Sequence, residues 1–207
     1  MRRHPGEPEA TGWRPITVLD TVQRLHDASP DVAGRPRLIA IDGRGGAGKT
    51  TVAERLRRAV PNSAVVHTDD VAWHHACFDW GALLAEHVLA PLHRGEAVDY
   101  RPDAWAAHDR PGAITVPAGL DYVWIEGTGI IRAELARWLD ASMWLQGARD
   151  GNAPEQREHV AAWLREELPF MLRERPWSRA TMIVAGPPPP GHDPETGLLV
   201  APPIEHS

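Results

Sequence analysis

Residues 43–50 read Gly43-Arg44-Gly45-Gly46-Ala47-Gly48-Lys49-Thr50 and match the pattern G-x-x-x-x-G-K-[ST] at every fixed position. Lys49 is the only lysine in a chain that has 22 lysine and arginine residues in all. An ammonium group is a compact point charge and a guanidinium is a planar fork, so the retained lysine indicates a role that arginine does not fill. The stretch therefore predicts a phosphate-binding loop.

The segments on either side of this loop supply the context that the motif requires. Residues 38–41 form a short apolar run, Leu-Ile-Ala-Ile, which is typical of a buried parallel strand. After the loop, Val52, Leu56 and Val60 recur at helical spacing, and Pro61 ends the run. In such a unit, backbone N–H groups and the positive end of the helix point at a bound phosphate.

Each part of the loop has an expected role in binding ATP and Mg²⁺. We expect Lys49 to reach the β- and γ-phosphates as a catalytic residue and the Thr50 hydroxyl to ligate the metal. The residues predicted to bind the nucleotide are Gly43, Arg44, Gly45, Gly46, Ala47, Gly48, Lys49, Thr50 and Thr51.

Composition limits the class of protein. At 207 residues the chain is long enough for one domain with a substantial core, and its single cysteine, Cys77, cannot form an internal disulfide. No stretch approaches membrane-spanning length, and a net charge of −6 disfavours broad binding to nucleic acid. These features predict a cytoplasmic protein without membrane or nucleic-acid partners, and they leave homo-oligomerisation open.

Short apolar strands alternate with helical patterns along the chain, which predicts an α/β fold. We expect a three-layer P-loop NTPase fold, with a mostly parallel five-stranded sheet flanked by helices. Strands are predicted at 38–41, 63–68, 121–127, 141–145 and 180–185, and helices at 16–26, 52–60, 81–93, 130–139 and 155–173.

Three regions are expected from this pattern. Residues 1–34 form an N-terminal segment that is polar and loose up to residue 14 and then carries a short helix. Residues 35–186 form the kinase-like domain. Residues 187–207 form a proline-rich tail, predicted to be flexible because Pro187-Pro188-Pro189-Pro190 can continue neither a sheet nor a helix.

Carboxylates stand at the ends of two predicted strands. Asp69 and Asp70 follow the second strand, and Glu126 ends the third. Parallel strands deliver their carboxyl ends to one edge of a sheet, so these groups are expected beside the phosphate loop. We assign Asp69 the role of general base or orienter of the acceptor hydroxyl and Glu126 a role at the metal. The alternatives are that the aspartates cap the next helix and that Glu126 is an ordinary surface residue.

The ordered set of these segments resembles the uridine kinase branch of P-loop kinases, which includes phosphoribulokinase and bacterial pantothenate kinase. The resemblance covers about residues 36–185. It is carried by the run from Ile41 to Thr51, the pair Asp69-Asp70, the stretch from Tyr100 to Arg110 and the run Val123-Trp124-Ile125-Glu126-Gly127.

The resemblance implies that Asp69 is the catalytic base and that a small-molecule acceptor, most simply a nucleoside, binds nearby. The acceptor-site residues assigned on this basis are Asp70, Tyr100, Arg101, His108 and Arg110. Trp105 and Trp73 are candidates to stack on a base, and the alternative for both is packing in the core. In this family an arginine-rich lid follows the fourth strand, whereas residues 147–154 hold only Arg149. Arg157 and the cluster Arg173, Arg175 and Arg179 are the other lid candidates.

The sequence therefore predicts a phosphotransferase that moves the γ-phosphate of ATP to an alcohol, with a nucleoside hydroxyl as the leading candidate acceptor. A kinase for a different metabolite alcohol, or an ATP-binding protein that transfers nothing, stays open. A GTPase is disfavoured because the guanine-reading Asn/Thr-Lys-x-Asp motif needs a second lysine. His74, His75 and Cys77 suggest zinc only weakly, since no second ligand cluster accompanies them.

Overall fold

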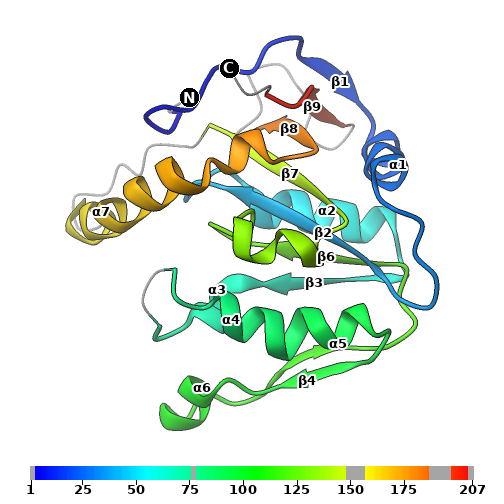
Figure 1. Ribbon diagram of the computed structural model, residues 1–207, viewed down its shortest axis with the longest axis vertical. Helices are drawn as coiled ribbons and strands as arrows, with labels where there is room; N and C mark the ends of the chain where they lie inside the picture. Colours follow the sequence, from blue (N-terminus) through cyan, green and yellow to red (C-terminus); the bar gives the residue numbers. More distant parts are fainter. Residues whose placement is uncertain (1–2, 76–77, 148–156, 187–196, 205–207) are drawn as a thin grey trace.

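The computed structural model describes residues 3–75, 78–147, 157–186 and 197–204, excluding the side chains of residues 157–162. A seven-stranded mixed sheet forms its centre, in the order β1-β9-β8-β7-β2-β6-β3 (Figure 1). These strands are β1 (Arg14–Ile16), β2 (Arg37–Gly43), β3 (Ser63–His67), β6 (Tyr122–Glu126), β7 (Ala141–Gln146), β8 (Met182–Ala185) and β9 (Leu198–Ala201). A separate antiparallel pair joins β4 (Val98–Tyr100) to β5 (Ile114–Val116).

The sheet is mostly parallel, as the sequence predicts. Strands β8, β7, β2, β6 and β3 pair in parallel, whereas β9 pairs antiparallel with both β8 and β1. The predicted count of five strands was wrong because β9 and β1 extend the sheet at one edge. β9 lies in the tail expected to be flexible: Leu198-Leu199-Val200-Ala201 is apolar enough to pair with the edge of β8.

Helices pack on both faces of the sheet. One face is covered by α1 (Val18–Ala28) and α2 (Lys49–Ala59). The other is covered by the continuous run α4 (Gly81–Leu84), η1 (Ala85–Leu89) and α5 (Ala90–His93), by η2 (Ala133–Trp138) and by α7 (Arg157–Glu174). The short elements are α3 (Thr68–Ala72), α6 (Asp103–Ala107) and η4 (Pro176–Ser178). The helix expected over 130–139 is only the 3₁₀ segment η2.

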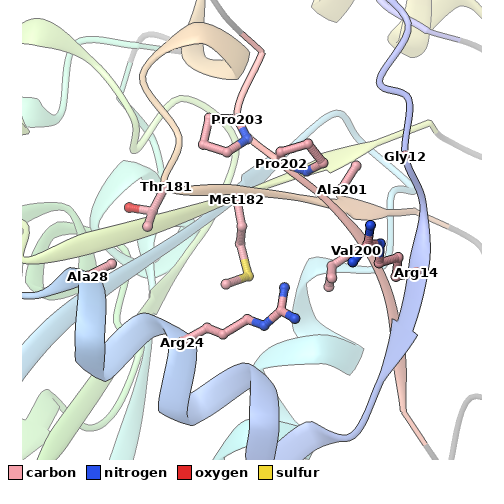
Figure 2. Close-up of a pocket in the computed structure, with 10 residues that line it drawn as sticks. All are labelled: Gly12, Arg14, Arg24, Ala28, Thr181, Met182, Val200, Ala201, Pro202 and Pro203. Atoms are coloured by element: carbon pink, nitrogen blue, oxygen red, sulfur yellow. The ribbon is translucent and has the colours of Figure 1, made fainter.

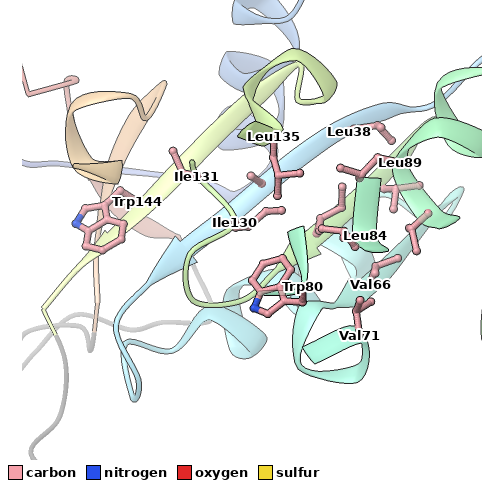
Figure 3. Packing of buried hydrophobic residues seen from close by; sticks show 14 of the residues in the cluster. Leu38, Val66, Val71, Trp80, Leu84, Leu89, Ile130, Ile131, Leu135 and Trp144 are labelled. Carbon is pink, nitrogen blue, oxygen red and sulfur yellow. The ribbon is translucent and has the colours of Figure 1, made fainter. Parts of the chain in front are cut away.

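The alternation of side chains along β2 divides the core in two. Leu38 and Ala40 point to the face of α4 and η2, where Leu84 and Leu135 join them (Figure 3). Ile39 and Ile41 point to the face of α1 and α2. All four β2 side chains are fully buried, so β2 reads as a continuous apolar run because both faces of a parallel sheet are covered.

The N-terminal segment packs on the sheet, although the sequence predicted a loose chain there. Glu7 is buried, and its Oε1 accepts hydrogen bonds from Trp144 Nε1 and from Gln146 Nε2, the latter at 2.8 Å. Its Oε2 accepts one from the backbone N–H of His4 at 2.8 Å. Gln146 Oε1 accepts from the backbone N–H of Ala10 at 2.9 Å. A polar composition therefore concealed a specific hydrogen-bonded attachment to the carboxyl end of β7.

Glu7→Gln tests this attachment. Both oxygens of Glu7 accept hydrogen bonds, so the amide nitrogen of glutamine would face one of these N–H donors instead of an acceptor. A buried donor would then be unpaired, which costs about 1–3 kcal/mol. Urea unfolding should show this loss of unfolding free energy. Glu9→Gln is the matched control, because the Glu9 side chain is 71% exposed and its one ion pair among the described residues is with Arg3. Equal stability of the two variants would contradict the assignment.

Candidate functional site

The phosphate loop connects β2 to α2, and its glycines are set by close packing. A Cβ at Gly43 would lie 2.9 Å from the Cβ of Leu145, and Gly48 has a φ of +91°. Gly48 is the N-cap of α2, which begins at Lys49. The loop therefore takes a backbone path that glycine alone follows without strain, and the first turn of α2 faces the same space.

Lys49 lies folded over the loop. Its Nζ donates to the carbonyl oxygens of Gly43 at 2.9 Å and Arg44 at 3.0 Å, and to Thr128 Oγ1 at 3.0 Å. The Thr128 hydroxyl in turn donates to the Gly43 carbonyl at 3.1 Å. Each partner of the ammonium is a neutral oxygen, so an anionic oxygen would bind Lys49 more strongly than the partners it has here.

Asp42, which directly precedes the loop, is fully buried and accepts three backbone hydrogen bonds. Oδ1 accepts from Gly43 N at 2.7 Å and from Gly129 N at 2.9 Å, and Oδ2 accepts from Ile131 N at 2.8 Å. Burial raises the pKa of Asp42 to about 6, against the opposing effect of these amides and of Lys49. Asp42 thus joins the phosphate loop to the segment that follows β6. Sequence reasoning gave Asp42 no role.

Glu126 receives two hydrogen bonds on one oxygen. Thr50 Oγ1 donates to Glu126 Oε1 at 2.9 Å, and His67 Nδ1 lies 2.6 Å from the same oxygen. Burial alone would raise the pKa of Glu126, but the hydrogen bonds from His67 and Thr50 and the charge of Lys49 bring it below its usual value. Glu126 is buried, so the alternative of an ordinary exposed residue is wrong.

His67 is the polar residue of this group that sequence reasoning missed. The hydrogen bond to Glu126 raises the pKa of His67 above its usual value, against the opposing effect of burial. Parallel pairing places the two residues directly opposite each other on β3 and β6. The available signal was that His67 and Glu126 are each the penultimate residue of a predicted strand, but strand register is not visible in the sequence.

Asp69 and Asp70 lie in the first turn of α3, and α3 has no side-chain cap hydrogen bond. Helix capping therefore does not account for the pair. Asp69 is exposed and makes no hydrogen bond or ion pair with a described residue. Although the residue as a whole is exposed, partial desolvation of its carboxyl group raises the pKa of Asp69. The negative charges of Glu126 and Asp70 raise this pKa further, and the positive charge of Lys49 opposes them. Asp70 instead pairs with Arg110.

The predicted acceptor residues gather around that ion pair, with one exception. The guanidinium of Arg110 lies 3.6 Å from the ring centroid of Trp105, whose Nε1 donates to the Asp70 carbonyl at 2.9 Å. Arg101 Nη2 donates to the Arg110 carbonyl at 3.1 Å. His108 joins the group through edge contact with Trp73, 5.7 Å between centroids.

Tyr100 is the exception. Its ring stacks on His87 with a centroid separation of 4.3 Å. His74 stacks on His108 at 3.9 Å and so belongs to the group, although sequence reasoning considered it only for zinc. Of the residues suggested for zinc, Cys77 lies outside the described residues. Within the described ranges, no group of three or more His, Cys, Asp or Glu side chains is placed to hold a metal ion.

Two arginines near the loop are buried. Arg44, the second residue of the phosphate loop, pairs at 3.7 Å with Glu167 of α7, so its side chain is directed toward α7. Burial raises the pKa of Glu167, against the charge of Arg44. Arg132 donates to the carbonyls of Gly129 at 2.6 Å and Phe78 at 2.7 Å. Neither pairing was predicted, because Glu167 and Phe78 are distant in sequence.

The lid candidates are only partly described. Residues 148–154, including Arg149, lie outside the described residues, as does the side chain of Arg157. Arg173 Nε pairs with Glu174 at 3.0 Å, and Arg179 Nε donates to the Glu174 carbonyl at 2.9 Å. Both of these arginines therefore bind the end of α7.

No helix of the described residues has the length and apolarity needed to cross a membrane.

Comparison with known proteins shows the fold. A structure described as a possible uridine kinase from Bacillus stearothermophilus matches with a TM-score of 0.54 and 19% identity, covering 79% of this chain and 98% of that chain. A "putative fructose transport system kinase" from Silicibacter sp. TM1040 matches with a TM-score of 0.46 and 18% identity, covering 76% and 89%. No protein-family model and no curated protein matches the sequence. The chain has a uridine kinase-like P-loop kinase fold.

Asp42→Asn should destabilise the protein. All three of its partners are N–H donors, so the amide nitrogen of asparagine would leave at least one buried donor unpaired, at a cost of about 1–3 kcal/mol. Denaturant unfolding measures this. Asp99→Asn, at an exposed position on β4, is the control and should change little. A loss for Asp42→Asn no larger than that of the control would exclude the proposed connection.

His67→Asn should show the charge of His67 as a pH-dependent contribution to stability. Asparagine keeps an N–H donor but cannot become charged. Because the folded pKa of His67 lies above its usual 6.5, the extra stability is complete below that value and is lost as pH rises through the folded pKa. His67 is 38% exposed, so the effect should stay below about 1 kcal/mol.

The measurement compares the unfolding free energies of wild type and His67→Asn in metal-free, nucleotide-free buffer at about pH 6 and about pH 9. The gap should close at the higher pH. His75→Asn, at an exposed histidine, is the control. A gap that is constant across the two pH values would mean that the ion pair adds no stability.

Proposed function

We propose that the protein is an ATP- and Mg²⁺-dependent kinase that transfers the γ-phosphate to a hydroxyl of a small molecule, most simply of a nucleoside. The observation that carries this proposal is the placement of Lys49, Thr50, Glu126 and Asp69 where β2, β3 and β6 end beside the phosphate loop. The uridine kinase-like fold supports it.

The chain's own groups suit a bound polyphosphate. The backbone N–H groups at the start of α2 carry partial positive charge, and Lys49 adds a full one. Phosphate oxygens can replace the three neutral oxygens that hold Lys49, because each of these groups keeps another hydrogen bond. Thr128 Oγ1 still donates to the Gly43 carbonyl, and Ala47 N still donates to the Arg44 carbonyl. Phosphoryl transfer depends mainly on such positioning and on offsetting charge.

The oxygens of Thr50 and Glu126 fit magnesium. The ion prefers oxygen ligands and commonly takes only one or two from protein, with waters and substrate phosphates completing its shell. When bound, it would neutralise charge on the transferring phosphoryl group. Thr50 and Glu126 already share a hydrogen bond at 2.9 Å, so their oxygens are gathered at one point. Glu126 is held ionised by the hydrogen bonds it accepts, which suits a metal-side carboxylate.

Asp69 is the carboxylate available to the acceptor. Asp70 is neutralised by Arg110, whereas Asp69 makes no hydrogen bond or ion pair among the described residues. The raised pKa of Asp69 makes it a better proton acceptor than an ordinary aspartate. It would orient the acceptor hydroxyl and take its proton. The ion pair Asp70–Arg110 would then form the wall of the acceptor site.

A metabolite alcohol other than a nucleoside is the second candidate acceptor, and one observation favours it. Tyr100, which the resemblance assigns to the acceptor, stacks on His87. The residues that do surround the Asp70–Arg110 pair are histidines, tryptophans and a second arginine. These groups suit a polar or anionic alcohol as well as a base.

Paired substitutions test the chemistry. Lys49→Ala should abolish ATP-dependent turnover, because the only lysine charge at the phosphates is lost. Asp69→Asn should retain ATP binding and lower transfer by about 10²–10⁴-fold, the usual contribution of a general base. Asp70→Asn should mainly raise the KM for the acceptor. Mass spectrometry of products from a panel of nucleosides, sugars and hydroxy acids measures transfer, and calorimetry measures ATP binding.

Two results would contradict this scheme. Wild-type activity in Asp69→Asn would assign the base elsewhere. Folded wild-type protein that binds no MgATP would exclude a kinase altogether, whereas tight MgATP binding without any phosphorylated product would favour a non-transferring ATP-binding protein.

A further inference from the structure

A pocket of about 460 Å³ lies between α1, the start of β8 and the end of β9 (Figure 2). We call it the α1–β8 pocket. Its main lining residues are Arg14, Arg24, Ala28, Thr181, Met182 and Val200. β8 runs parallel to β7, which runs parallel to β2, and the pocket adjoins the amino end of β8. The phosphate loop follows the carboxyl end of β2, so the two sites are separate.

Local sequence explains the hollow. Arg24 and Ala28 are four residues apart and lie on the same face of α1, while Leu25 turns inward and is fully buried. The methyl group of Ala28 leaves room above Met182 and Val200. These two side chains are 6% and 3% exposed and belong to the core, so they form an apolar floor.

The polar groups at this pocket are donors. Arg14 comes from β1 and Arg24 from α1, and Figure 2 shows both beside the floor residues. Neither guanidinium makes a hydrogen bond or ion pair with a described residue, and none of the described residues that line the pocket is acidic. Elsewhere, exposed Arg57 pairs with Glu54, and Arg94 pairs with Glu96. The α1–β8 pocket thus has two unpaired guanidinium groups at one hollow.

Thr181 adds a third donor. Its Oγ1 accepts a hydrogen bond from Ser142 N at 3.0 Å, which leaves its own proton free for donation. Arginine binds carboxylate and phosphate oxygens through two parallel N–H groups, and an apolar floor binds the remainder of a small molecule. The volume lies within the range of ligand-binding pockets.

We infer that the α1–β8 pocket binds a small organic anion: a phosphate or carboxylate on an aromatic or branched apolar body. Arg14 and Arg24 bind the anionic group, and Met182 and Val200 contact the body. This inference stands independently of the proposed kinase activity.

Methionine methyl NMR tests the inference at the pocket itself. The chain has four methionines. Met143 is the strand neighbour of Met182 in the same core cluster, whereas Met171 is fully buried in the cluster on the other face of the sheet. With ¹³C-labelled methyl groups, Met182→Leu identifies the Met182 signal. The probes are phenyl phosphate, benzoate and benzyl alcohol. Binding of phenyl phosphate at the phosphate loop does not interfere, because the Met182 signal reports only on its own surroundings.

One or both anions should shift the Met182 signal saturably and leave the Met171 signal in place. The double variant Arg14→Ala/Arg24→Ala should weaken anion binding at least about tenfold, equivalent to about 1.4 kcal/mol, and leave benzyl alcohol binding unchanged. Both side chains are exposed, so the variant should fold. Arg57→Ala/Arg94→Ala is the matched control and should bind as wild type does.

The two anions separate the two chemistries: tighter binding of phenyl phosphate assigns a phosphate ligand, and tighter binding of benzoate assigns a carboxylate. No saturable shift of Met182 with either anion would overturn the inference. Equal anion affinity in the wild type and the Arg14→Ala/Arg24→Ala variant would overturn it as well, because the guanidinium groups would then have no part in binding.

Discussion

The buried carboxylate of Asp42 is the constraint on which the site geometry depends. Its oxygens accept from Gly43 at the start of the phosphate loop and from Gly129 and Ile131 after β6. A buried carboxylate without these donors would be strongly disfavoured, and the amides need an acceptor, so the two segments hold each other in one arrangement. That arrangement places Thr128 within 3.0 Å of Lys49. The position of the ammonium thus follows from a hydrogen-bond requirement within the core.

Strand pairing adds the carboxylate side of the site. β6 lies between β2 and β3, so Glu126 is opposite Ile41 on one side and His67 on the other. Thr50, one residue into α2, reaches the same oxygen of Glu126 as His67 does. The two donors to Glu126 therefore come from the adjacent strand β3 and from α2, the helix that follows the phosphate loop. A site assembled from rigid elements in this way needs little reorganisation when a charged ligand binds, which is the condition for effective electrostatic stabilisation.

Sequence patterns predicted those parts of the molecule that depend on local or periodic signals. The loop motif, the apolar run of β2 and the carboxylates at strand ends predicted a parallel α/β sheet with Lys49, Thr50 and Glu126 at one edge. Pairings between distant segments were not predictable. Glu7 with Trp144, Arg44 with Glu167 and β9 with β8 join residues whose partners are set by tertiary packing. Polar and proline-rich composition at both ends of the chain further concealed that parts of them belong to the sheet.

Arg44, Arg132 and Lys49 have different kinds of partner, and this difference explains why the loop contains a lysine in a chain that otherwise uses arginine. Arg44 and Arg132 are both buried, and removal of Glu167 would leave the charge of Arg44 uncompensated in the core. A guanidinium fits such positions because it holds several acceptors in one plane. Lys49 instead bonds to neutral oxygens in a partly open site. In the proposed function, its ammonium would exchange those partners for phosphate oxygens by rotation of the flexible side chain. The loop therefore combines an arginine that fixes it to α7 with a lysine that is free to respond to an anion.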